Sequence, residues 1–65
     1  MTVLFMEQPL LLPDGATLSA CIAAHSPYGT EPVIAVVNGA RVDPDAPRAL
    51  SEGDAVYLYP LLIGG

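Results

Sequence analysis

One helix-forming segment lies between strand-forming segments, and this order limits the fold more than any other feature of the chain. Leu18, Cys21 and Ile22 recur at helical spacing and predict a helix over residues 17–25. The hydroxyl of Thr17 can accept a backbone N–H of the first turn, and Pro27 lies just beyond the helix end. The chain therefore predicts an α+β domain in which one helix packs on one face of a sheet.

Apolar runs, and the turn residues between them, define the expected strands. Branched and aromatic residues fill the runs, while proline, glycine, aspartate and asparagine separate them. Pro60 has no N–H and is expected to end the last strand. Leu50 is expected to be the apolar anchor of the long connection before that strand. The expected strands are residues 2–6, 10–12, 33–37, 40–42 and 55–59, with a turn at residues 7–9.

Size and charge limit the classes of function. A chain of 65 residues predicts one small domain, without the bulk for a deep catalytic cleft, so we expect a carrier or binding module rather than an enzyme. The net charge is −5 and only two residues are basic, which argues against binding of nucleic acid or of an anionic membrane. Acidic residues such as Glu52 and Asp54 are expected to attract a partner with a basic patch, although acidity can also serve solubility alone.

Reactive side chains are few, and none of them predicts a catalytic or metal site. Cys21 has no second cysteine to pair with, and on the core face of the helix it is expected to act as a small apolar residue. His25 stands alone, and Asp43 and Asp45 lack further ligands, so no metal is expected. Without a signal-peptide pattern or a membrane-length apolar run, the chain is expected to be cytoplasmic.

The sequence closes on Gly64 and Gly65, which we expect to form a thin tip. Glycine has no side chain, so such a tip can enter a narrow channel in an enzyme. An α-carboxylate on Gly65, with a pKa of about 3.5, is ionised at neutral pH and can act as a nucleophile. We expect residues 1–60 to form the folded domain and residues 61–65 to form a flexible tail.

Alternation along two strands predicts an apolar patch on the sheet face away from the helix. If Val56 and Leu58 face the helix, Tyr57 and Tyr59 lie on the open face. An exposed patch of this kind marks an interface, with tyrosine a frequent anchor, although aromatic residues also favour strands in general. The residues expected to contact a partner are Ile34, Val36, Tyr57, Tyr59, Leu61, Leu62, Ile63 and Gly64.

Five short segments together carry a family resemblance. They are residues 3–8, Gly15-x-Thr17-Leu18, residues 35–39, Leu50-x-x-Gly53-Asp54-x-Val56, and Gly64-Gly65. The chain resembles the β-grasp (ubiquitin-like) sulfur-carrier proteins of thiamine and molybdopterin biosynthesis, the ThiS/MoaD family. The resemblance implies a mixed sheet of four or five strands in the order 2-1-5-3, with the first and last strands parallel at its centre.

The resemblance also implies a function and a set of partners. An E1-like enzyme adenylates the carboxylate of Gly65 with ATP, and a sulfur donor such as a cysteine desulfurase or rhodanese leaves a thiocarboxylate there. A sulfur-accepting synthase then takes the sulfur, and the carrier itself holds no cofactor. The pathway stays open among thiamine, molybdopterin, tRNA thiolation and secondary metabolites. The alternatives are a protein modifier conjugated through Gly65, which the absence of lysine disfavours, and a β-grasp interaction module with an inert tail.

Overall fold

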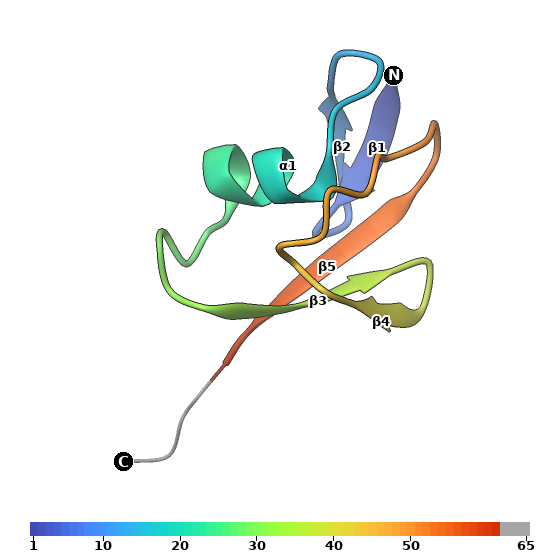
Figure 1. Ribbon diagram of the computed structural model, residues 1–65. Helices are drawn as coiled ribbons and strands as arrows, with labels where there is room; N and C mark the ends of the chain where they lie inside the picture. The colour runs from blue at the N-terminus through green and yellow to red at the C-terminus, as the bar shows by residue number, and fades with distance from the viewer. Residues whose placement is uncertain (62–65) are drawn as a thin grey trace.

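The computed structural model describes residues 1–61, which form one helix and five strands in a single sheet (Figure 1). This confirms the α+β prediction. No helix within these residues is long and apolar enough to cross a membrane. The elements are β1 (Thr2–Phe5), β2 (Gln8–Leu11), α1 (Leu18–His25), β3 (Val33–Val37), β4 (Ala40–Val42) and β5 (Ala55–Pro60).

The sheet is mixed, with the order β2-β1-β5-β3-β4. β1 and β5 run parallel at its centre, as expected, and the other neighbours pair antiparallel. The expected order 2-1-5-3 differs from this order because it omits β4. The turn at Asn38 and Gly39 has positive φ at both residues, as a tight type I′ hairpin requires, and it returns the chain along the outer edge of β3.

The first hairpin turns earlier than expected. Met6 and Glu7 both have positive φ, so two residues close the turn, and the predicted turn over residues 7–9 is wrong. Pro9 instead lies inside β2, opposite Leu4. The N–H of Leu4 donates to Asp54 O at 2.8 Å, on the β5 side. At this position β1 and β2 exchange no bond, so the missing N–H of Pro9 costs nothing at the sheet edge.

The last strand runs further than expected. Pro60 is its final residue and lies opposite Val33, and the N–H of Leu61 still donates to Pro32 O at 3.0 Å. The expectation that Pro60 ends the ladder is therefore wrong. The bond at Leu61 shows why, since neighbouring residues of a strand direct their N–H groups to opposite sides, and the nitrogen of Pro60 points away from β3.

A core between α1 and the sheet holds the elements together. Thr17 caps the helix as expected, with its hydroxyl accepting the N–H of Ala20 at 3.2 Å. Leu50 is buried as expected, and its N–H donates to Ala16 O at 2.9 Å, which ties the long connection to the helix start. The buried residues are Val3, Phe5, Leu12, Leu18, Cys21, Val33, Ala35, Val37, Leu50, Val56 and Leu58.

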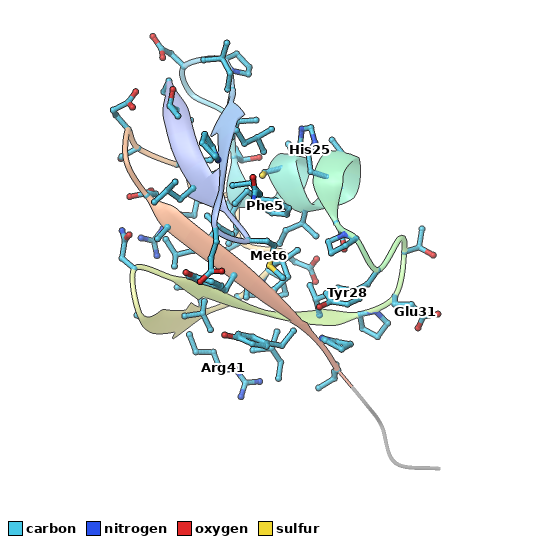
Figure 2. The ribbon with its side chains drawn as sticks, turned by 180° about the vertical axis from the view of Figure 1, so that it is seen from behind. Phe5, Met6, His25, Tyr28, Glu31 and Arg41 are labelled. Atoms are coloured by element: carbon cyan, nitrogen blue, oxygen red, sulfur yellow. The ribbon has the colours of Figure 1, made fainter. Side chains whose placement is uncertain are left out.

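His25, the last residue of α1, is not part of the buried core. His25 falls on the same helical face as Leu18 and Cys21, but its side chain is exposed. Its ring lies edge-on to that of Phe5, with 6.3 Å between the ring centroids (Figure 2). His25 therefore covers the rim of the core rather than joining it.

Candidate functional site

The two sides of β5 differ sharply in exposure. Val56 and Leu58 face the helix and are fully buried, whereas Tyr57 is half-buried and Tyr59 is 50% exposed. Successive side chains of a strand point to opposite faces, so both tyrosines lie on the open face of the sheet. The expected orientation of β5 is confirmed.

β3 brings two aliphatic side chains beside these tyrosines. Ile34 lies directly opposite Tyr59, and Val36 lies directly opposite Tyr57. Both aliphatic residues are half-buried, while their neighbours along β3 are buried on the helix side. Directly opposite residues on one face are close enough to contact each other. We call Ile34, Val36, Tyr57 and Tyr59 the tyrosine patch, and all four are residues that the sequence analysis assigned to a partner-binding surface.

The apolar surface extends beyond the tyrosine patch to residues that the sequence analysis did not identify. Leu4 is 45% exposed and Leu11 is 79% exposed. Leu4 alternates with the buried Val3 and Phe5, and Leu11 lies opposite Thr2, so both share the open face. Together with Tyr59 and Leu61, they are the only exposed large apolar residues within residues 1–61.

Two charged residues border the tyrosine patch. Arg41 in β4 lies opposite Val36 and shares its face. The hydroxyl of Tyr57 donates to Glu7 Oε1 at 3.4 Å. The pKa of the Tyr57 hydroxyl is raised: the largest cause is loss of solvent around it, and the next is the nearby negative charge of Glu7. The hydroxyl therefore stays protonated and able to donate at neutral pH. No sequence pattern indicated the Glu7 contact, because this contact depends on the tight turn after β1.

The acidic residues expected to attract a basic partner, Glu52 and Asp54, have hydrogen-bond partners within the chain. Asp54 accepts the side-chain N–H of Asn38 at 2.9 Å and the backbone N–H of Ser51 at 2.8 Å, and these two hydrogen bonds lower the pKa of its carboxyl. Glu52 accepts the N–H of Thr2 at 2.9 Å. Both carboxylates precede β5, at the end of the strand away from Leu61, and they order the turn before it.

Two side chains occupy the part of β5 that β1 does not reach. β1 pairs with β5 only as far as Val56. Beyond that point the N–H of Leu58 donates to Met6 Sδ at 3.1 Å, and the hydroxyl of Tyr28 approaches Leu58 O at 3.5 Å. Figure 2 shows Met6 and Tyr28 on this side of the strand. These contacts satisfy the backbone of Leu58, which would otherwise offer a free strand edge.

The chain leaves the sheet next to the tyrosine patch. Leu61, a predicted partner-binding residue, is 41% exposed and directly follows β5. Leu62, Ile63, Gly64 and Gly65 lie outside the described residues, so their expected roles stay predictions. The structure thus brings Ile34, Val36, Tyr57, Tyr59 and Leu61 to one region of the surface.

Cys21 has the environment of a core residue. It lies on the buried side of α1. That burial raises the pKa of its thiol, so the thiol is protonated at neutral pH. Among residues 1–61, no three histidine, cysteine, aspartate or glutamate side chains lie close enough together to hold a metal ion.

No protein-family model and no curated protein matches this chain. The architecture, one helix over a mixed five-stranded sheet, is compatible with a β-grasp fold.

Proposed function

We propose that this chain is a sulfur carrier with a β-grasp fold of the ThiS/MoaD type, and that it presents the carboxylate of Gly65 to partner enzymes. The observation that carries the proposal is the position of β5. This strand lies at the centre of the sheet, parallel to β1, and exposes Tyr59 and Leu61 where the chain leaves the fold. Exposed apolar residues gathered on one face are typical of an interface. On this proposal they would hold the partner beside the segment that ends in Gly65.

The tyrosine patch would dock on an E1-like adenylating enzyme while the tail enters that enzyme. Four residues follow Leu61 in the sequence. An extended segment of that length can reach about 13 Å, at about 3.3 Å per residue. This is long enough to place Gly65 inside a partner while the sheet stays outside. The missing side chains of Gly64 and Gly65 would keep the path narrow.

The chemistry at Gly65 needs a nucleophile from this chain and everything else from its partners. The ionised carboxylate attacks the α-phosphorus of ATP and releases pyrophosphate, forming an acyl adenylate. The terminal sulfur of a persulfide on a donor such as a cysteine desulfurase or rhodanese then attacks the acyl carbon and displaces AMP, forming an acyl disulfide. A second thiol attacks the donor's sulfur in that disulfide, so that a disulfide forms on the donor and the acyl sulfur leaves with the electron pair. The product is a thiocarboxylate, which a sulfur-accepting synthase consumes. The carrier contributes no acid, base or metal to these steps.

Mass spectrometry tests this proposal. The protein is incubated with the E1-like enzymes of its own organism, ATP and a sulfide source, and its intact mass and C-terminal fragments are measured. We expect one oxygen to be exchanged for sulfur at Gly65, with no change when ATP is omitted. Absence of both the adenylate and the thiocarboxylate with every such enzyme would reject the proposal, and amide-linked conjugates through Gly65 would favour a protein modifier instead.

A further inference from the structure

A cavity of about 700 Å³ lies at the outer edge of β3. Its lining residues come from α1, the loop after α1, β3, and the chain that leaves β4; these elements are drawn in Figure 1. This volume falls within the range of about 300–1,000 Å³ that is typical of ligand sites. The apolar residues that line it include Ile22, Ala23, Val33, Ile34, Val42 and Leu61.

The cavity contains an unpaired piece of strand edge. β4 pairs only with Ala35–Val37. If its register continued, Asp43 would lie opposite Ile34 and Pro44 opposite Val33, and Pro44 has no N–H to donate to Val33. The bond from Leu61 N–H to Pro32 O fixes the alternation along β3, so the N–H and C=O of Val33 point outward. Among residues 1–61, no loop or turn backbone hydrogen bond uses either group.

The rim of the cavity carries an excess of negative charge. Glu31, Asp43 and Asp45 line it, against one basic residue, Arg41. The only ion pair within the described residues joins the Met1 amino group to Asp14. The three rim carboxylates therefore have no basic partner in that part of the chain, and a positively charged ligand would supply one.

We propose that this cavity binds an extended peptide segment of a partner protein, separately from the reaction at Gly65. Its backbone would pair with Val33 and continue the sheet where β4 stops. One apolar side chain would enter the cavity between Ile22 and Val42. Flanking lysine or arginine side chains would lie near Glu31 and Asp45, which accounts for the charge of the rim.

Synthetic peptides test each part of this inference. The probe is a short capped peptide of alternating valine and isoleucine with a lysine at each end, titrated into the ¹⁵N-labelled protein. We expect the largest NMR shifts at Val33, Val42 and α1, and weaker binding at high salt. The matched probes replace both lysines by glutamate, or methylate the backbone nitrogens, and we expect each to bind at least about tenfold more weakly.

Variants separate the cavity from the tyrosine patch. Replacing the two rim carboxylates together, Glu31→Gln with Asp45→Asn, should weaken the lysine peptide about fivefold or more, because both groups lie at the surface and face its charges. Glu7→Gln, which removes a carboxylate beside Tyr57, should leave that affinity unchanged. Ile22→Asp should abolish binding, and circular dichroism checks that the variant is folded.

Three results would overturn the inference. These are equal affinity for the lysine and glutamate peptides, shifts that centre on Tyr57 and Tyr59, and no binding of the lysine peptide at millimolar concentration. Equal affinity of the N-methylated peptide would reject the strand pairing at Val33. Each result is independent of thiocarboxylate formation, so failure here leaves the proposed function standing.

Discussion

The two faces of the sheet use similar residues for different purposes. On the helix side, Val3, Val56 and Leu58 are completely buried. On the open face, Leu4 and Tyr59 come from the same two strands and are about half exposed. Hydrophobicity does not distinguish the two sets; what differs is that α1 covers one face and leaves the other to solvent (Figure 1). The helix side stabilises the domain, and we propose that the open face binds a partner.

The comparison teaches that a strand with apolar residues on both sides can carry fold and recognition at once. Fully burying a large apolar side chain contributes about 1.5–3 kcal/mol, which a small domain needs on its helix side. The same side chain left in water contributes little to folding. Retaining several of them on one face is consistent with a docking surface.

The largest effect is expected on the helix side. Leu58→Ala removes a fully buried side chain from the core and should lower the free energy of unfolding by about 2–5 kcal/mol. Urea denaturation followed by circular dichroism measures this. The matched control is Leu4→Ala on the open face, which should change stability by less than about 1 kcal/mol. Equal losses in the two variants would mean that the faces do not differ as described.

Binding should show the opposite dependence. Tyr59→Ala should weaken affinity for the adenylating enzyme by about 2 kcal/mol or more, because a central exposed tyrosine is a common interface anchor. Its stability should change by less than about 1 kcal/mol. Calorimetry measures the affinity, and Leu11→Ala at the far edge sharpens the comparison by showing how far the docking surface extends. Wild-type affinity in Tyr59→Ala would remove the tyrosine patch from the account.

Asp54 should contribute a smaller, pH-dependent effect. The hydrogen bonds from Asn38 and Ser51 lower the pKa of its carboxyl below the ordinary value of 3.8. A lowered pKa stabilises the fold above that ordinary value, and this contribution is lost as the pH falls below it through the lowered pKa. Because the carboxyl is near solvent, Asp54→Asn should cost only about 1 kcal/mol at pH 7. Unfolding curves at pH 7 and pH 2.5 should show this cost shrinking in acid; a cost that does not shrink would contradict the assignment.

Removing Gly64 and Gly65 should have the smallest effect on stability. We expect the melting temperature to stay within about 2 °C, corresponding to less than about 0.5 kcal/mol, while thiocarboxylate formation is lost completely. Differential scanning calorimetry and intact mass measure the two quantities on the same sample. A large drop in melting temperature would show that these residues belong to the fold rather than to the reaction.

Sequence patterns predicted most of the fold because alternation and capping are local signals. Val33–Val37 matched its expected range, Thr17 caps the helix, and Leu50 anchors the long connection. The first turn was not predicted, because Met6 and Glu7 adopt positive φ although neither is glycine, and no local sequence pattern indicates this conformation. Pro60 was misjudged because its effect depends on the side of β5 to which its nitrogen points.

The candidate site was predictable only where polar and apolar sides could be separated. β5 allowed this, because its tyrosines alternate with Val56 and Leu58. β3 is apolar at every position, so Ile34 and Val36 could be assigned to the open face only on the condition that Val33, Ala35 and Val37 face the helix. The run through β1 is apolar at almost every position, so it gave no indication that Leu4 faces outward. The side-chain contacts of Met6 and Glu7 with β5 join residues about fifty positions apart, and they depend on the parallel pairing of β1 with β5.

The most direct test of the account is to map the surface that the adenylating enzyme covers. NMR spectra of the labelled protein are recorded with and without the enzyme, and signals are compared between the two faces of the sheet. The account predicts the largest changes on the open face, at Leu4, Ile34, Val36, Tyr57 and Tyr59, with the helix-side core unchanged. Changes centred on α1, with the open face unaffected, would contradict it.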